Sequence, residues 1–304
     1  MKRMFVSLLS LLLAALLLAA MPGQAMAVGD APVAENLELR TYCDVTVGGK
    51  LSAFDPKGGT LRFEITTEPV KGSIALAEDG SFLYTPAADR RGRDYFGYKA
   101  VDETGNRSQE ATVIIQILKP KKAVTYADMQ GTAGEYAAVA LSELGLYNGR
   151  KICGVSCFEP EASMSRGEFL SMCMALTGKP LLSGIYRTGY LDDDLIPAWQ
   201  KAYASAAAIN GVYRGLSTES GVVFSGEEPI TYAEASVLLD TALELENVSY
   251  LSGYTELDLR QAQACMNLSA YTAEVPEGTR QDTLLTRLDA AKMLVAAWEF
   301  LEQR

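Results

Sequence analysis

Short runs in which every second residue is apolar occupy the stretch from about residue 33 to residue 118. Examples of these apolar positions are Leu61, Phe63, Ile65, Val113, Ile115 and Ile117. A period of two is typical of a strand that buries one of its faces. Turn signals such as Asp79-Gly80 separate the runs, and an Asp-Gly pair between two strands favours a hairpin. Short strands with turns between them predict an all-β sandwich over residues 28–118.

The pattern changes after the segment KPKK at residues 119–122, which we interpret as a linker. Beyond it, apolar residues recur every three or four positions, as in Ala137, Leu141 and Leu144. This spacing lines one face of a helix. The sequence therefore predicts a multidomain chain in which an all-α array follows the sandwich.

The helical half contains an internal repeat. The segment FEPEASMSRGEF starts at Phe158, and 66 residues later the segment FSGEEPITYAEA starts at Phe224. Glycines align at the same offset in both copies, at Gly145, Gly149, Gly211 and Gly215. Identical spacing through a loop and into a helix indicates a true repeat, whose unit is a helix, a glycine-marked turn, a loop and a second helix.

A third copy of the repeat lies near the C-terminus and is degenerate. Its segment LLTRLDAAKML matches the end of the other two copies, but both glycines are missing and Thr279 replaces the phenylalanine. The predicted boundaries are 123–178 for the first repeat, 186–246 for the second and 247–304 for the third.

Each copy carries a hydroxyl residue followed three positions later by an acid. The pairs are Ser165 with Glu168, Thr231 with Glu234, and Thr286 with Asp289. This spacing predicts a capping box, in which the hydroxyl accepts from an otherwise unpaired amide and the acid accepts from the cap residue's own amide. The six residues are therefore interpreted as structural helix caps rather than as general acids or bases. Asp128 and Asp192 are expected to cap or brace the first helix of their repeats.

Arg166 and Arg287 occupy the first helical position, where Tyr232 stands in the middle copy. A cation is mildly unfavourable at the positive end of a helix. Together with free amides, however, a guanidinium there makes a site for a carboxylate. The alternative is a solvated surface arginine. Tyr232 can stack on a ring but cannot pair with a carboxylate.

The chain contains no histidine, which excludes Ser-His-Asp triads, Cys-His dyads and most catalytic zinc sites. Because the repeated acids are interpreted as caps, we predict that the protein is not an enzyme and uses no cofactor or metal. The formal net charge of −11 repels phosphate backbones, so nucleic acid is a poor partner. For Cys153 and Cys157 a disulfide or free thiols are favoured over a metal site, which would need further ligands.

The first 27 residues have the features of a secretory signal peptide. Lys2 and Arg3 precede an apolar run from Phe5 to Ala20, and Ala25-Met26-Ala27 resembles a cleavage site. The run is short for a membrane span, which needs about 20 residues, and no second long apolar segment follows. We expect an exported mature chain with a net charge of about −13 and no membrane span.

The β half resembles the cadherin-like or bacterial immunoglobulin-like domains of exported surface proteins. The residues that carry the resemblance are Leu51, Asp55-Pro56, Gly72, Asp79-Gly80, Phe82, Tyr84, Pro86, Asp94, Phe96 and Tyr98. The resemblance implies the fold but not a ligand. Some relatives bind calcium between modules, whereas Asp55 and Asp102 here are interpreted as turn-forming residues.

The helical half resembles the S-layer homology domain. The matching motifs are YAD at Tyr126 to Asp128, YLD at Tyr190 to Asp192, the Phe-x-Pro and Ser-Arg-x-Glu segments, and Trp199 at an aromatic position of the family. Such domains come as three tandem copies that attach exported proteins to bacterial cell-wall polysaccharide. The resemblance implies that Arg166 and Arg287 contact acidic wall sugars, often with pyruvate ketals, and that the binding residues also include Tyr232, Trp199, Gly149 and Gly215.

These observations predict an exported, non-catalytic protein of the bacterial cell surface, held non-covalently on the wall or S-layer by its repeats while it displays the β module. The alternative is an adhesin or carbohydrate-binding protein whose main ligand is bound by the sandwich, with the repeats acting only as an anchor. An enzyme is the third possibility, and the absence of histidine argues against it.

Overall fold

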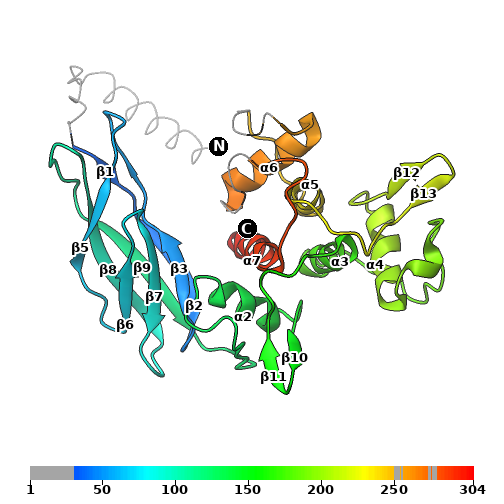
Figure 1. The fold of residues 1–304 in the computed structure, drawn as a ribbon, viewed down its shortest axis with the longest axis horizontal. Coiled ribbons are helices and arrows are strands. Elements are labelled where there is room, and N and C mark those ends of the chain that lie inside the picture. The colour runs from blue at the N-terminus through cyan, green and yellow to red at the C-terminus, as the bar shows by residue number, and fades with distance from the viewer. Residues whose placement is uncertain (1–30, 250–253, 255, 273–274, 276–278) are drawn as a thin grey trace, which may run out of the picture.

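The computed structural model describes residues 31–249, 254, 256–272, 275 and 279–304. The predicted signal peptide lies outside the described residues. Figure 1 shows a β module on one side and a helical region on the other. Within the described residues, no helix is long and apolar enough to cross a membrane.

The β module is a sandwich, as predicted. Its first sheet has the strand order β2-β9-β8-β5, with the bounds Leu37–Tyr42, Ala111–Leu118, Gly92–Val101 and Arg62–Thr67. Its second sheet has the order β3-β7-β6, with the bounds Val47–Lys50, Ser81–Pro86 and Gly72–Leu76. A short pair joins β1, Val33–Ala34, to β4, Ala53–Phe54. Strand β2 runs parallel to β9, and the other pairs are antiparallel.

The sandwich core consists of the alternating apolar positions. Phe96 on β8 lies opposite Val113 on β9, and both are fully buried. The aromatic motif also supplies polar anchors. The hydroxyl of Tyr84 donates to Asp94 Oδ2 at 2.7 Å, and Asp94 also accepts from the amides of Val70 and Lys71. The Asp-x-Phe-x-Tyr motif therefore combines a buried ring with a carboxylate that ties two segments to β8.

The helical half contains six α-helices within the described residues. Their bounds are α2 Glu135–Glu143, α3 Arg166–Leu176, α4 Ala198–Ile209, α5 Tyr232–Leu243, α6 Leu259–Thr272 and α7 Arg287–Gln303. A 3₁₀ turn, η1 (Asp193–Leu195), precedes α4. The first helix of each repeat packs on the second helix of another repeat, because α4 contacts α3, α6 contacts α5, and α2 contacts α7. The contacts therefore close into a ring in which the first repeat meets the third.

The expectation of an all-α array was wrong in one respect. Each of the first two repeats contains a β-hairpin between its helices, formed by β10 (Arg150–Ile152) with β11 (Val155–Cys157) and by β12 (Leu216–Thr218) with β13 (Gly221–Val223). Most residues of these hairpins are exposed. Because neither face is buried, the strands leave no alternating apolar pattern in the sequence.

The segments that precede α3, α5 and α7 meet at the centre of the helical half. Single β-bridges join Ser163 to Thr286, Ser165 to Pro229 and Thr231 to Leu284. Each segment thus pairs with both of the others, and the three helices begin from one closed hub. This pairing connects the repeats through backbone atoms far apart in sequence.

The predicted linker is held against the helical half. The amides of Lys121 and Lys122 both donate to the carboxylate of Glu143 at 2.7 Å. The sandwich itself also contacts α2, since the amide of Gly48 donates to Ala133 O at 3.2 Å and the rings of Tyr42 and Tyr136 lie 5.7 Å apart.

Candidate functional site

The three predicted capping boxes are present at the central hub. Ser165 Oγ accepts from the Glu168 amide at 3.3 Å, and Glu168 Oε2 accepts from the Ser165 amide at the same distance. The pairs Thr231–Glu234 and Thr286–Asp289 make the same two contacts. The acid of each repeat therefore fixes the start of a helix, which is a structural task.

The first-turn amides beside the two arginines are not free for an anion. The Arg166 amide donates to Glu228 O at 2.9 Å and the Gly167 amide to Gly226 O at 2.8 Å. The Arg287 amide likewise donates to Ala162 O at 2.8 Å. The interpretation of a carboxylate site built from free amides is thus wrong, because carbonyls of a neighbouring repeat already occupy these donors.

Arg166 points into the loop of the second repeat. The residue is 6% exposed, and Nη1 donates to Ser225 O at 2.6 Å while Nη2 pairs with Glu234 Oε1 at 3.0 Å. Both guanidinium nitrogens face acceptors of the chain itself. The alternative of a solvated surface arginine is therefore wrong at this position.

Arg287 makes the equivalent contact with the loop of the first repeat. It is 8% exposed, and Nη1 donates to Phe158 O at 2.8 Å and to Glu159 O at 3.1 Å. Its guanidinium also lies over the ring of Tyr147, 5.0 Å from the ring centre. Because Glu159 and Ser225 are 66 residues apart, both arginines grip the same position of the repeat. Arg287 is therefore buried as well, and is not a solvated surface arginine.

Asp128 and Asp192 hold the same loops from the other side. Asp128 accepts from the amides of Phe158 and Glu159 at 2.8 and 2.7 Å, and Asp192 accepts from the amides of Phe224 and Ser225 at 2.7 and 2.8 Å. These aspartates therefore brace the loop, and not the first helix as expected. We call this arrangement, with an aspartate on the amides and an arginine on the carbonyls, the loop clamp.

The loop clamp holds two non-glycine residues in the left-handed region. Glu159 has φ of 58° and Ser225 has φ of 51°. This conformation is unfavourable for residues with a Cβ atom and persists where surrounding contacts enforce it. The clamp supplies those contacts in both repeats.

Tyr232 stands where the third arginine would be. It is 8% exposed, and its amide donates to Thr283 O at 2.9 Å, as the Arg166 amide does to Glu228 O. In the cyclic order of the hub, Tyr232 therefore faces the third repeat. That repeat has Thr279, not phenylalanine, in its loop, so the exchange of Arg for Tyr accompanies a change in the partner loop.

Steric contacts inside the repeats require glycine at positions 149 and 215. Their φ values are +70° and +87°, and an added Cβ would lie 2.3 Å from the Tyr126 ring or 2.6 Å from the Tyr190 ring. Neither glycine lines the cavities described below. They let the tyrosine of the aromatic-x-Asp motif pack against the turn.

Trp199 lies on a separate groove of about 280 Å³ between α3 and α4. The tryptophan is 55% exposed, and the groove is also lined by Tyr147, Tyr203 and Glu168. The buried hydroxyl of Tyr147 has no hydrogen-bond partner in the described part of the chain. Its counterpart Tyr213 donates to Phe224 O at 3.0 Å. In the first repeat the corresponding carbonyl, Phe158 O, accepts from Arg287 instead. The Tyr147 hydroxyl is therefore left without a hydrogen-bond partner.

The predicted binding residues do not form one site. Trp199 lies in the aromatic groove, whereas Arg166, Arg287 and Tyr232 belong to the hub. Sequence reasoning missed Tyr147 and Tyr203. The signals were present, since Tyr147 aligns with Tyr213 in the repeat, and Tyr203 follows Trp199 by one helical turn on the same face of α4.

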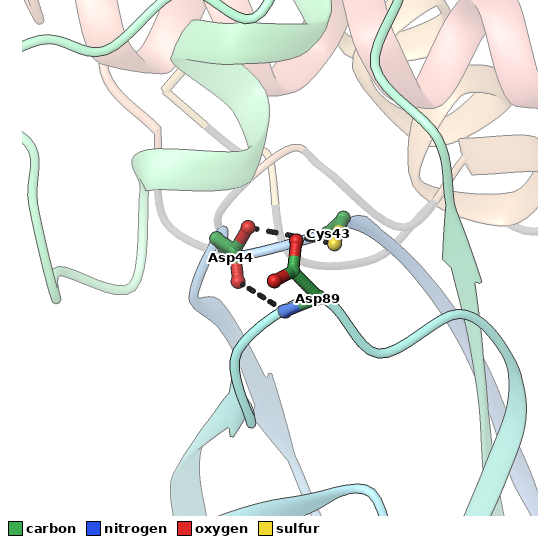
Figure 2. Close-up of side chains that lie close together, drawn as sticks. All are labelled: Cys43, Asp44 and Asp89. Carbon is green, nitrogen blue, oxygen red and sulfur yellow. Dashed lines mark hydrogen bonds between the residues drawn. The ribbon is translucent and has the colours of Figure 1, made fainter.

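One group in the described residues has the spacing of a metal site. It comprises Cys43, Asp44 and Asp89 in the β module (Figure 2). Asp44 accepts from the Asp89 amide at 3.0 Å and from the Cys43 thiol at 3.5 Å. Burial, with Asp44 adjacent, raises the pKa of Cys43 and so keeps the thiol protonated. The Asp44 carboxylate therefore joins the turn after β2 to the segment between β7 and β8, which is a structural role.

The other candidate ligands have structural roles. Asp55 accepts from the amides of Lys57 and Gly59, and Asp102 accepts from the amides of Thr104 and Asn106. Both are turn-forming residues, in agreement with the sequence interpretation. All five cysteines are free thiols, including Cys153 at the tip of the first hairpin and Cys157 on its second strand.

The fold of the β module defines it as an immunoglobulin-like sandwich. Residues 29–119 match the family model of the bacterial cadherin-like domain. This part of the chain is therefore a bacterial cadherin-like domain. No curated protein matches the chain.

Solved structures resemble parts of the chain. An endo-fucoidan hydrolase of glycoside hydrolase family 107 is 17% identical, with a TM-score of 0.26, over 31% of this chain and 14% of that protein. The SrpA adhesin of Streptococcus sanguinis is 14% identical, with a TM-score of 0.26, over 33% and 64%. A SusE-like surface-located polysaccharide-binding protein of Bacteroides thetaiotaomicron is 16% identical, with a TM-score of 0.23, over 29% and 14%. The matched part spans about a seventh of the length of the first of these structures, and TM-scores this low carry no argument about function.

Proposed function

We propose that this chain is an exported, non-catalytic protein of the bacterial cell surface that binds a cell-wall polysaccharide through its helical repeats and displays the cadherin-like domain. The observation that carries the proposal is the groove containing Trp199, Tyr147 and Tyr203. An exposed tryptophan and two half-buried tyrosines beside a polar group suit sugars, because the apolar face of a sugar ring packs on an aromatic face while its hydroxyls find acceptors. The resemblance of the repeats to S-layer homology domains supports the same function.

The arginines have a different role in this proposal from the one that the resemblance implies. Arg166 and Arg287 keep the repeats joined, and a sugar carboxylate would have to displace their present acceptors. The groove is lined by Glu168 and by no lysine or arginine. We therefore infer that it recognises sugar rings by stacking and hydroxyl contacts. This lining does not favour the recognition of acidic groups, including pyruvate ketals.

A second candidate function rests on the β module. A cleft of about 570 Å³ lies between the strands β3, β6 and β7 and the helices α2 and α7. Its lining includes Phe82, Leu83 and Val295 and is largely apolar. This cleft supports the alternative of an adhesin whose ligand contacts the sandwich, with the repeats as attachment only.

Co-sedimentation with purified peptidoglycan sacculi tests the proposed function. The mature chain should bind intact sacculi, and removal of their secondary polysaccharide should abolish binding. Trp199→Ala should weaken binding about tenfold, equivalent to about 1.4 kcal/mol. Tyr186→Ala is the matched control, because Tyr186 is 86% exposed and lies outside the groove. Equal binding by the wild type and Trp199→Ala would contradict the role of the groove.

A further inference from the structure

A third cavity lies beside the start of α4, in the second repeat. It has a volume of about 220 Å³ and is bounded by η1, the first turn of α4 and the loop that follows β13. It shares no lining residue with the groove of Trp199. The proposed polysaccharide site therefore does not account for it.

The buried amide of Gln200 lines this cavity without a partner for its oxygen. Gln200 is 1% exposed, and within the described residues Oε1 accepts no hydrogen bond. The amide packs against Gly167, where an added Cβ would lie 2.3 Å from Oε1. Buried polar atoms in folded proteins are almost always paired. The unpaired acceptor therefore points to a donor group that enters the cavity.

The charges around the cavity favour a cationic donor. Three acids line it, Asp192, Glu227 and Glu228, and no lysine or arginine does. Asp192 already accepts from two backbone amides. Glu227 and Glu228 are exposed. Their carboxylates are thus available at the mouth, and a chain with a net charge of −11 attracts cations from a distance.

The remaining walls distinguish an organic cation from a metal ion. Leu195, Ile196, Pro197 and Val223 form an apolar side of the cavity, and Leu195 is 75% exposed. An alkyl chain packs on such a wall, whereas a hydrated metal ion gains nothing from it. The three acids of this cavity also do not form a group whose ligand atoms all lie within 4.8 Å of one another. Within the described residues, the group of Cys43, Asp44 and Asp89 alone does so.

We propose that this cavity binds a primary ammonium group on an alkyl stem, as a lysine side chain carries it. The ammonium lies between the carboxylates of Glu227 and Glu228 and donates a hydrogen bond to Gln200 Oε1. The methylene groups of the stem pack on Leu195 and Val223. An amino sugar presents the same ammonium without the stem, so the two sources can be distinguished. The site would let the second repeat recognise a free amine on a peptide, independently of any polysaccharide bound at Trp199.

Titration of the full chain with small amines, followed by NMR or calorimetry, tests this proposal. Nα-acetyl-lysine amide should bind saturably and shift the signals of Ser225 and Gly226. The isosteric norleucine derivative, which lacks the charge, should bind at least tenfold more weakly. Glucosamine should also bind more weakly than the lysine derivative. Equal binding of the lysine and norleucine derivatives, or stronger binding of glucosamine, would overturn the proposal, as would the absence of saturable binding by the lysine derivative.

Variants locate the binding in this cavity. The double variant Glu227→Gln, Glu228→Gln should weaken binding of the lysine derivative at least tenfold, and both positions are exposed, so folding should be preserved. Glu219→Gln, an exposed acid at the tip of the β12–β13 hairpin, is the matched control and should leave binding unchanged. If the double variant and the control bind equally well, the proposal is refuted. Sedimentation with sacculi reports separately on the Trp199 groove, so the two sites can fail independently.

Discussion

Arg166 and Asp192 hold Ser225 from opposite sides. The arginine donates to the carbonyl of Ser225 at 2.6 Å, and the aspartate accepts from its amide at 2.8 Å. The same relationship joins Arg287 and Asp128 at Glu159. In both cases the aspartate belongs to the repeat that contains the loop, and the arginine comes from another repeat. The loop clamp therefore couples the formation of each loop to the assembly of the three repeats.

Removal of either clamp arginine should destabilise the helical half. Arg166→Ala leaves Ser225 O and the Glu234 carboxylate without their partner, and we expect a loss of about 3 kcal/mol in the free energy of unfolding. Chemical denaturation followed by circular dichroism measures this loss. Arg214→Ala, at an exposed position, should change stability by less than about 0.5 kcal/mol. A clamp variant as stable as this control would mean that Arg166 does not join the repeats.

Ser225 should tolerate glycine better than a branched residue. Its φ of 51° lies in the left-handed region, where a Cβ atom is unfavourable. Ser225→Gly should therefore leave stability unchanged or raise it by up to about 1 kcal/mol, whereas Ser225→Val should lower it by about 1–2 kcal/mol. Thermal unfolding of both variants provides the comparison. The reverse order would show that the left-handed conformation is not the source of strain.

The β module should lose stability in acid through Asp94. Burial raises the pKa of this carboxyl, but hydrogen bonds from Tyr84 and from the amides of Val70 and Lys71 outweigh burial, so its pKa is lowered. A carboxyl with a lowered pKa in the folded state stabilises the fold above its unfolded pKa of about 3.9, and the contribution disappears as the pH falls below that value.

Asp94→Asn tests this assignment. The variant should be about 1.5–3 kcal/mol less stable than the wild type at pH 7, and the difference should shrink as the pH falls below the unfolded pKa, because the wild-type carboxyl then gains a proton. Urea denaturation at several pH values measures both effects. A stability difference that stays constant from neutral to acid pH would contradict the role of the charged carboxylate.

Contact between the two halves should depend on the small size of Gly48. An added Cβ would lie 2.6 Å from Ala133 Cβ and 3.0 Å from Ala133 Cα, so β3 and the segment that precedes α2 would have to separate. Gly48→Ala should cost about 1–3 kcal/mol, as overpacking does in a core. Gly189→Ala is the control, because nothing lies within 4 Å of its added Cβ. Differential scanning calorimetry of both variants would show a lower Tm for the first alone. Equal Tm values would mean that the halves do not depend on this contact.

The features that the sequence determined are local. Alternation at Val113, Ile115 and Ile117 depends on one strand with one buried face, so the sandwich could be predicted from neighbouring residues. The capping boxes join residues three positions apart, such as Ser165 and Glu168. Their hydrogen bonds need no distant partner, and the three helix starts could therefore be read directly.

The tertiary structure decided what the arginines do. Arg166 bonds with a carbonyl 59 residues away, and Arg287 with one 129 residues away. Neither acceptor is marked by a side chain, because each is a backbone oxygen that the loop presents only once the repeats close into a ring. The same closure places carbonyls of a neighbouring repeat on the first-turn amides and brings Tyr147 beside Trp199. The repeat pattern in the sequence thus determined the helical units. Their cyclic packing determined which polar groups form hydrogen bonds within the protein and which remain available to a ligand.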